Sequence, residues 1–335
     1  MRFVARAPGK LVVLGEYAVL DGAPALVLAV DRYCHASIGP NGDSACHLET
    51  RTPRPQRIRR APGEPTGVAL VDLVCRETPE LRKLAPWRAV LDSTELFGTQ
   101  GKLGIGSSAA ALCAWAGVWA AWTGAAGCEP PKPQLGHLIR LHRTLQHGAG
   151  SGLDVAASLT GGAIEFRLED SAIPRVATVR LPERVLLKGV FTGSNASTPS
   201  LVARYREWAA ACPEAAQRQW QRMAAVTEAG CAAVRNDDAD AFLGAVTDYG
   251  RHLESLGKAV GADIVTAEHR EIGAAADEHE ISYKLSGAGG GDLGIAFARD
   301  RDALAAFASA VRSKGYPVID LDIDRQGLTV EEHPE

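Results

Sequence analysis

Two glycine-rich segments carry the residues whose types and spacing are best suited to chemistry. The first, residues 102–111, reads Lys-Leu-Gly-Ile-Gly-Ser-Ser-Ala-Ala-Ala. Gly104 and Gly106 can adopt positive φ angles and let a ligand approach the backbone, while Ser107 and Ser108 can cap the helix that the alanine run predicts. Because the first N–H groups of a helix attract anions, the segment predicts a phosphate-binding loop. Its spacing differs from G-x-x-x-x-G-K-[ST], so it is not a Walker loop.

The second glycine-rich segment, residues 284–294, reads Lys-Leu-Ser-Gly-Ala-Gly-Gly-Gly-Asp-Leu-Gly. Gly289, Gly291 and Gly294 match the spacing of the dinucleotide fingerprint, but a strand-like run follows where that fingerprint requires a helix. We therefore interpret the match as accidental. A tight glycine loop can be purely structural, yet two cradle-like loops in one chain are expected to fold around one ligand.

Two charged residues could complete such a site. Asp154 follows a glycine-rich turn at residues 148–152 and precedes an alanine-rich helix start. It is either an N-cap or a base and electrostatic anchor for a substrate hydroxyl that faces a γ-phosphate. Lys10 begins a predicted strand and is either a solvated lysine or, if it faces Asp154, a group that stabilises charge on a transferring phosphoryl group.

Composition excludes several classes of protein. The chain has 335 residues and a formal net charge of −4, and its arginine-rich segment 51–60 is interpreted as a solvated loop, so we expect no nucleic-acid partner. The seven cysteines form no C-x-x-C pair, the nine histidines are dispersed, and no serine lies in a G-x-S-x-G elbow. No apolar run reaches about 18 residues, the length of a membrane span, so we expect a cytoplasmic protein with no membrane contact.

Strands and helices alternate irregularly along the chain. Apolar runs between turn signals predict strands at residues 10–14, 25–30, 163–168, 186–192, 293–298 and 316–323. Helical patterns cover residues 107–123, 134–145, 199–211, 214–235, 237–256, 263–279 and 301–314. Since no strand–helix unit repeats, the pattern favours an α+β fold. The length suits two domains, and a change of composition at residues 170–184 predicts a crossing between residues 1–175 and 185–335.

Taken in order, three motifs resemble those of the GHMP kinases. They are Pro8-Gly9-Lys10 with Gly15-Glu16-Tyr17, residues 104–110, and residues 286–291. The resemblance spans nearly the whole chain. It implies a ribosomal-protein-like α/β ATP-binding domain over residues 1–175, a ferredoxin-like domain over 185–335, and ATP with Mg²⁺ in the cleft between them.

Within this family, four details resemble the phosphomevalonate kinases. They are Lys102 before the first glycine loop and the segments 150–156, 192–198 and 289–296. The resemblance implies ATP-dependent phosphorylation of (R)-5-phosphomevalonate to (R)-5-diphosphomevalonate in the mevalonate route to isoprenoids. The alternatives are a mevalonate kinase, another small-molecule kinase of the family, or a catalytically silent ligand sensor with the same fold.

Two positions depart from the patterns of these branches. Mevalonate kinases place a magnesium-binding glutamate about eleven residues before the aspartate, where this chain has Arg143. Phosphomevalonate kinases usually carry a lysine just before the glycine-serine-glycine turn, and residues 147–149 contain none. Because a second phosphate needs cationic partners, Lys102, Arg143 or His147 would have to take its place.

The resemblance also implies a role for each motif residue. Asp154 would accept a proton or orient the substrate phosphate, Lys10 would stabilise developing charge, and Ser108 would help to hold Mg²⁺. The ATP-binding residues would be Lys102, Gly104, Ile105, Gly106, Ser107, Ser108 and Ala109. The substrate-binding residues would be Lys10, Ser151, Gly152, Asp154, Ser197, Thr198, Ser286, Gly287, Ala288, Gly289 and Gly290. We expect a small-molecule substrate, phosphorylated mevalonate, and a monomer or homodimer.

Overall fold

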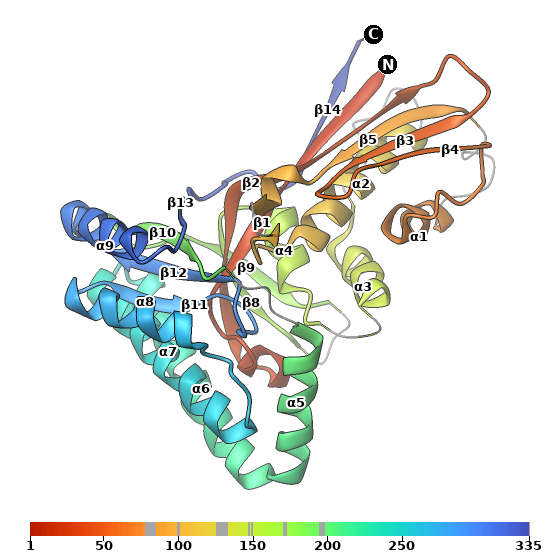
Figure 1. The fold of residues 1–335 in the computed structure, drawn as a ribbon. Helices are drawn as coiled ribbons and strands as arrows, with labels where there is room; N and C mark the ends of the chain where they lie inside the picture. The colour runs from red at the N-terminus through yellow and green to blue at the C-terminus, as the bar shows by residue number, and fades with distance from the viewer. Residues whose placement is uncertain are drawn as a thin grey trace.

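A computed structural model describes residues 1–77, 85–98, 101–124, 133–146, 148, 150–169, 173–193 and 198–334. Within these ranges an eight-stranded and a four-stranded sheet form the framework (Figure 1). The strands are β1 (Arg2–Leu14), β2 (Pro24–Pro40), β3 (Cys46–Arg51), β4 (Gln56–Arg60), β5 (Trp87–Asp92), β6 (Phe97–Gly98), β7 (Gly101–Lys102), β8 (Ala163–Arg167), β9 (Arg175–Val179), β10 (Leu186–Phe191), β11 (Ser282–Leu285), β12 (Leu293–Ala298), β13 (Val318–Asp320) and β14 (Thr329–His333). The helices are α1 (Ala69–Arg76), α2 (Ser107–Thr123), α3 (Leu135–Leu145), α4 (Leu153–Thr160), α5 (Thr198–Ala211), α6 (Pro213–Arg235), α7 (Ala239–Val260), α8 (Ala267–Glu278) and α9 (Arg301–Ser313), with short 3₁₀ turns at Ala18–Asp21 and Thr94–Leu96.

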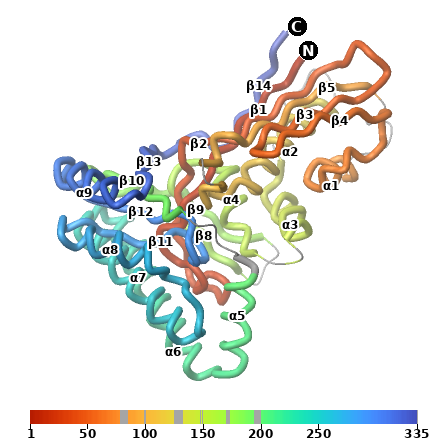
Figure 2. The backbone as a smooth tube through the Cα atoms, in the orientation of Figure 1, coloured from red at the N-terminus to blue at the C-terminus, as the bar shows by residue number. Residues whose placement is uncertain are grey.

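The larger sheet is built on the long antiparallel pair of β1 and β2. Its order is β14-β1-β2-β5-β3-β4, and β8 and β9 extend it from the second half of β2. The strand β14 pairs with the first residues of β1, which places the two chain ends side by side (Figure 2). The register of β1 against β2 shifts between Pro8 and Gly9, so a bulge lies directly before Lys10.

Helix α2 is the buried helix of the larger sheet, as the sequence predicts. It packs on β1 and β2, and twelve of its residues are buried. Trp115 and Trp119 stack at 5.8 Å and meet Trp87 of β5 edge to face. Because a helix that is apolar on every face is stable only inside the protein, this packing holds the start of α2 in a fixed position.

The smaller sheet, in the order β11-β12-β10-β13, belongs to the second half of the chain. Helices α8 and α9 pack against it through a core that includes Ile272 and Phe307, while α7 contacts β11. Figure 1 shows this sheet with α6–α9 on one side of the molecule, and β3–β5 with α1–α3 on the other. The mixed architecture confirms the α+β class.

Two features of the sheets go beyond the sequence patterns. Strand β9 lies within residues 170–184, where we expected a crossing between domains, and it continues the larger sheet beyond β8. Strand β14 brings residues 329–333 back to β1. Both depend on pairing between distant segments, which no local pattern reveals. Among the described residues, no helix is long and apolar enough to cross a bilayer.

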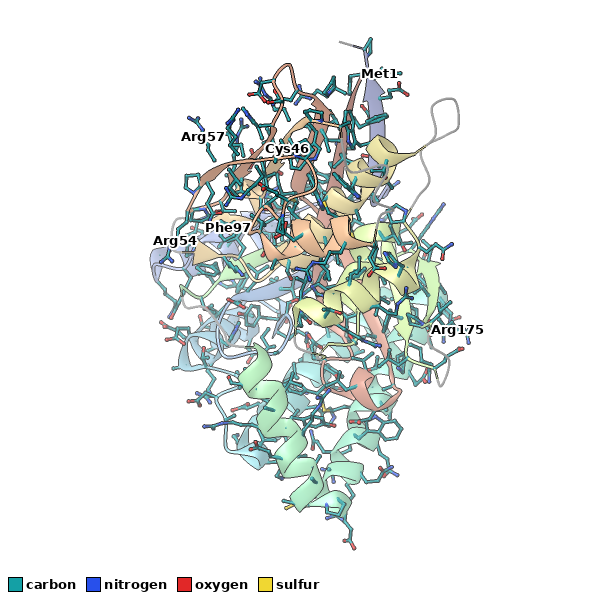
Figure 3. The ribbon with its side chains drawn as sticks, turned by 90° about the vertical axis from the view of Figure 1, so that its right-hand side faces the viewer. Met1, Cys46, Arg54, Arg57, Phe97 and Arg175 are labelled. Atoms are coloured by element: carbon teal, nitrogen blue, oxygen red, sulfur yellow. The ribbon has the colours of Figure 1, made fainter. Side chains whose placement is uncertain are left out.

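The arginine-rich segment lies on the outside, as predicted, but residues 56–60 form strand β4 rather than a loop, because they pair with β3. Arg54 and Arg57 lie on the β3–β4 hairpin, at the edge of the molecule in the view of Figure 3. The Arg57 side chain is 87% exposed and reaches Glu49 at 3.7 Å. This hairpin is a solvated face and contributes nothing to the cavity described below.

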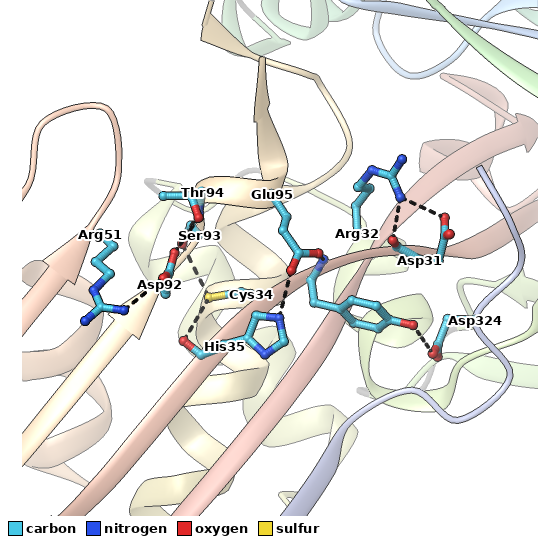
Figure 4. A network of polar contacts seen from close by, with 11 residues as sticks. Asp31, Arg32, Cys34, His35, Arg51, Asp92, Ser93, Thr94, Glu95 and Asp324 are labelled. Carbon is cyan, nitrogen blue, oxygen red and sulfur yellow. Dashed lines mark hydrogen bonds and ion pairs between the residues drawn. The ribbon is translucent and has the colours of Figure 1, made fainter. Parts of the chain in front are cut away.

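A polar network fixes the segment that leads to the first glycine loop (Figure 4). Glu95 accepts a hydrogen bond from Tyr33 N and contacts His35 at 3.0 Å, while Ser93 Oγ lies 3.3 Å from Cys34 Sγ. Each contact joins the turn after β5 to β2. Leu103 N then donates to the Leu96 carbonyl, so the loop begins from an anchored position.

Candidate active site

A cavity of about 600 Å³ lies where the first turns of α2 and α4 meet β1 and the second glycine segment. Its described lining is Lys10, Val12, Glu16, Tyr17, Val19, Leu20, Lys102, Gly104, Gly106, Ser107, Ser108, Gln146, Gly150, Ser151, Leu153, Asp154, Val202, Ser286, Gly287, Ala288 and Asp292. All three sequence motifs therefore reach one space. Apolar side chains line part of it, and glycines with polar and charged side chains line the rest, as in many small-molecule sites.

Glycines allow the first glycine loop to lie against β1. Lys10 N donates to the Ile105 carbonyl at 2.8 Å, and a Cβ at Gly9 would meet the same oxygen at 2.8 Å. Gly106 is the N-cap of α2 with φ 78°, and no side chain caps the helix, so the predicted serine cap is wrong. Glycine stands at this cap because the backbone is left-handed there. The first turn of α2 thus presents N–H groups that have no partner within the helix.

Gly104 lets the two glycine segments touch. Its φ is 76°, and a Cβ there would lie 2.6 Å from Asp292 Cβ. Asp292 itself has φ 60°, and its carbonyl accepts hydrogen bonds from Thr192 N and Oγ1 at 3.0 Å. The carboxylate of Asp292 therefore enters the cavity from a constrained backbone.

Lys10 is the buried cation of the cavity. It is 8% exposed, and burial lowers the pKa of its ammonium group from the ordinary value of 10.5, while the charges of Asp154, Glu16 and Asp292 act in the opposite direction. A Cβ at Gly106 would lie 3.0 Å from Lys10 Cγ. The close backbone limits the positions that the lysine side chain can adopt.

Asp154 lies in the first turn of α4, just after the glycine turn. The N-cap of that helix is Gly152 with φ 90°, so the capping interpretation of Asp154 is wrong. A Cβ at Gly152 would meet Ile139 at 2.7 Å, which explains why the turn is glycine-rich. The turn is held by Arg143, whose guanidinium donates to the carbonyls of Gly150 and Ser151 at 3.2 Å.

The segment after β11 closes the cavity from the second half of the chain. Ser286 Oγ accepts a hydrogen bond from Val12 N at 2.9 Å, which joins the two sheets. Gly289 has φ 85° and no room for a Cβ beside the Ile264 carbonyl, to which Gly290 N donates at 2.9 Å. These backbone contacts fix the loop that presents Gly287 and Ala288.

A buried ion pair lies beneath this loop. Lys284 and Glu16 form a salt bridge, and their side chains are 0% and 3% exposed. Lys284 Nζ also donates to the carbonyls of Val12 and Leu285, and Gly287 N donates to Glu16 Oε1 at 3.3 Å. The pair joins the first motif to the second glycine-rich segment.

Most of the sequence-predicted site residues line the cavity. They are Lys10, Lys102, Gly104, Gly106, Ser107, Ser108, Ser151, Asp154, Ser286, Gly287 and Ala288. Five others do not: Ile105 and Ala109 are buried in the core, and Gly152, Gly289 and Gly290 shape the backbone behind the lining. Ser197 lies outside the described residues, as does the side chain of Thr198.

Several lining residues were not among the predicted site residues. Glu16 and Tyr17 belong to the first motif and Asp292 to the second glycine-rich segment, so membership of these segments was the available signal. Gln146 and Val202 carry no such signal, because only the fold brings α3 and α5 to the cavity.

The lining suits a metal ion that arrives with a nucleotide. Within the described ranges no group of three or more His, Cys, Asp or Glu side chains could hold a resident metal. Mg²⁺ is usually held by one or two protein oxygens together with substrate phosphates and water. The hydroxyl of Ser108 and the carboxylate of Asp154 offer oxygens of this kind. The described lining has three carboxylates and two lysines, so carboxylate charges outnumber lysine charges even before phosphate groups enter. This charge balance also favours an added cation beside the phosphate groups.

Known proteins resemble the chain over nearly its full length. A phosphomevalonate kinase from Streptomyces sp. strain CL190 is 29% identical, covering 88% of this chain and 89% of its own length. A mevalonate kinase from Thermococcus sibiricus is 27% identical, covering 99% of both. No family model matches the chain.

Solved structures share the fold. The Lin0012 protein of Listeria innocua superimposes with a TM-score of 0.85 at 22% identity, covering 99% of this chain and 100% of its own. Phosphomevalonate kinase from Streptococcus pneumoniae, in complex with phosphomevalonate and AMPPNP, does so with a TM-score of 0.77 at 18% identity, covering 96% and 99%.

The glycine loop at the start of α2, the mixed two-sheet fold and the named kinase relatives together define a phosphotransferase. In sequence and fold the chain resembles the phosphomevalonate and mevalonate kinases.

Proposed function

We propose that the chain transfers the γ-phosphoryl group of ATP to the phosphate of (R)-5-phosphomevalonate, giving (R)-5-diphosphomevalonate and ADP. The observation that carries the proposal is the meeting of Lys10, Asp154 and the first turn of α2 in one cavity. A helix start is suited to nucleotide phosphates, and a lysine with a carboxylate is suited to the acceptor. The phosphomevalonate kinase relative supports this acceptor.

The transfer is a displacement at phosphorus. An oxygen of the acceptor phosphate bonds to the γ-phosphorus, the bond from that phosphorus to the β–γ bridging oxygen breaks, and ADP leaves. A phosphate monoester loses its second proton with a pKa of about 6, so the attacking oxygen is mostly ionised at neutral pH. Asp154 then orients the acceptor or takes its remaining proton.

Lys10 stabilises the charge that develops on the transferring group. Its burial strengthens electrostatic interactions in the cavity, and the three carboxylates around it favour the protonated form. Gly104, Gly106 and the first N–H groups of α2 would receive the nucleotide phosphates. Ser108 would hold Mg²⁺, which when bound neutralises charge on the β- and γ-phosphate oxygens.

Mevalonate is the second candidate acceptor. Arg143, which could have met a second phosphate, donates to the carbonyls of Gly150 and Ser151. Lys102 is the described lining cation, besides Lys10, that could take this place. An acceptor without phosphate needs fewer cations, and mevalonate kinases are among the relatives. With this acceptor Asp154 would have to remove a hydroxyl proton.

Initial rates of ADP release with a panel of acceptors test the proposal. Phosphomevalonate, mevalonate, homoserine and galactose are compared by kcat/KM under identical Mg²⁺ and ATP. We expect phosphomevalonate to exceed every other acceptor at least about tenfold. A higher value for mevalonate or a sugar rejects the assignment. ATP binding without ADP release for any acceptor would instead identify a ligand sensor.

A further inference from the structure

A buried histidine connects the predicted metal-binding serine with the predicted acid–base residue. His142 of α3 is 2% exposed, although it belongs to the helix that borders the cavity. Its Nε2 lies 3.0 Å from Ser108 Oγ, and its Nδ1 lies 3.6 Å from Asp154 Oδ1. The imidazole therefore stands between two groups that the proposed function uses and that come from different helices.

Three neighbours select one tautomer of this imidazole. The carboxylate of Asp154 can only accept, so the proton belongs on Nδ1, which faces it. Nε2 is then an acceptor, and Ser108 Oγ donates to it. The side-chain amide nitrogen of Gln146 lies 3.4 Å from the same Nε2 and is also a donor. All three contacts agree with a donor at Nδ1 and an acceptor at Nε2.

This tautomer determines what Ser108 offers to the cavity. Because the Ser108 hydroxyl gives its hydrogen to His142, its oxygen keeps both lone pairs for another partner. Ser108 lines the cavity, so those lone pairs are available to a cation held beside nucleotide phosphates. A partner that accepts the hydrogen of a ligating group orients that group and raises its basicity.

The residues near His142 at the C-terminal end of α3 make different contacts. Arg143 lies eleven residues before Asp154 in the sequence. Its guanidinium donates hydrogen bonds to the carbonyls of Gly150 and Ser151. A Cβ at Gly150 would meet the Gln146 side-chain oxygen at 2.5 Å. Of Arg143, Gln146 and His142, only His142 contacts both Ser108 and Asp154 among the described contacts.

We propose that His142 is a positioning residue for the metal–nucleotide complex: it orients Ser108 as a magnesium ligand and holds Asp154 toward the acceptor. This inference rests on the proposed function for the role of Asp154. The part that concerns Ser108 requires only that the cavity binds a magnesium–nucleotide complex.

Three substitutions separate the two contacts. His142→Gln places an amide near the former Nε2 and keeps a partner for Ser108. His142→Asn places an amide near the former Nδ1 and keeps a partner for Asp154, while His142→Leu removes both. His137→Asn is the matched control, because His137 lies on the same helix outside the cavity lining and contacts Arg140.

Calorimetry of ADP binding, with Mg²⁺ and with EDTA, is the main readout. Since loss of an outer-shell partner typically weakens metal affinity or activity 10–100-fold, we expect His142→Asn and His142→Leu to weaken MgADP binding at least about tenfold. Binding of metal-free ADP should change less than about twofold. His142→Gln should bind MgADP within about threefold of wild type but should lower kcat, because Asp154 loses its partner. The His137→Asn control should match wild type in every measurement.

The outcomes are separable from those of the acceptor test. Equal losses for MgADP and metal-free ADP would overturn the inference, because they indicate a packing role. Normal MgADP binding by His142→Asn and His142→Leu would overturn it too. If His142→Leu does not fold, the conservative variant His142→Gln still decides the question. Should His142→Gln bind MgADP as weakly as His142→Asn does, the proposal that His142 orients Ser108 is rejected. Wild-type binding is measured without acceptor, so failure of phosphomevalonate as substrate leaves the Ser108 result intact.

Discussion

Breaking the buried Lys284–Glu16 pair should strongly destabilise the protein. In Lys284→Met the Glu16 carboxylate stays buried, with Gly287 N at 3.3 Å as its described remaining donor. The carbonyls of Val12 and Leu285 also lose their donor. Removing one member of a buried pair typically costs about 3–5 kcal/mol, because the other charge is left without compensation. We expect a loss in this range from the free energy of unfolding.

Urea unfolding, followed by circular dichroism, measures this loss. Lys314→Met is the matched control, because Lys314 pairs with Glu271 at 3.2 Å while the two side chains are 42% and 47% exposed. An exposed pair of this kind contributes at most about 1 kcal/mol. The double variant Glu16→Gln with Lys284→Met removes both charges, and should recover at least about 1 kcal/mol relative to Lys284→Met alone.

The reasoning would be refuted by equal unfolding midpoints for Lys284→Met and Lys314→Met with unchanged slopes. It would also be refuted if Glu16→Gln failed to recover any stability in the Lys284→Met background. Either result would mean that the cavity side of the pair is hydrated or that the surrounding structure relaxes without penalty.

Four further substitutions test the site and the core around it. Asp154→Asn and Lys10→Met should each lower kcat at least about a hundredfold in the ADP-release assay, and near-normal turnover would remove both from the mechanism. Gly106→Ala should raise KM for ATP at least about fivefold, because φ is 78° and its Cβ would press on Lys10 Cγ at 3.0 Å; an unchanged KM would show that the loop tolerates this displacement. Burial lowers the pKa of His269 to about 4. As pH falls, His269 is therefore protonated at a lower pH in the folded state than in the unfolded state. The free energy of unfolding should therefore decrease from pH 6.5 to about 4, by at most about 1.4 kcal/mol per pH unit, and His269→Gln should show a shallower decrease in urea titrations at each pH.

Local signals predicted the elements of the fold that have strong periodicity or clear ends. The predicted helix at residues 107–123 coincides with α2, because an alanine-rich run lies between Gly106 and Gly124. Strand β14 was not predicted, since it is defined by pairing with residues 2–6 at the other end of the chain. Its exposed Glu331 and Glu332 give no apolar pattern.

The residues of the site also fall into those that local motifs predict and those that only the fold brings together. Glycine motifs are local, so Gly104, Gly106 and Ser286 could be found from the sequence. The partner of Ser108 could not, because His142 is one of several dispersed histidines and only the packing of α3 beside α2 brings them together. The Glu16–Lys284 pair joins residues 268 positions apart, and its burial depends on both sheets.

The central claim is that the cavity transfers phosphate from ATP to a phosphate acceptor. Phosphorus-31 NMR of wild type with ATP, Mg²⁺ and (R)-5-phosphomevalonate tests it most directly, because it identifies the bond that forms. We predict loss of the monoester signal and growth of two coupled diphosphate signals together with those of ADP, with at least a hundredfold slower conversion by Asp154→Asn. A persistent monoester signal, with mevalonate converted under the same conditions, would contradict the claim.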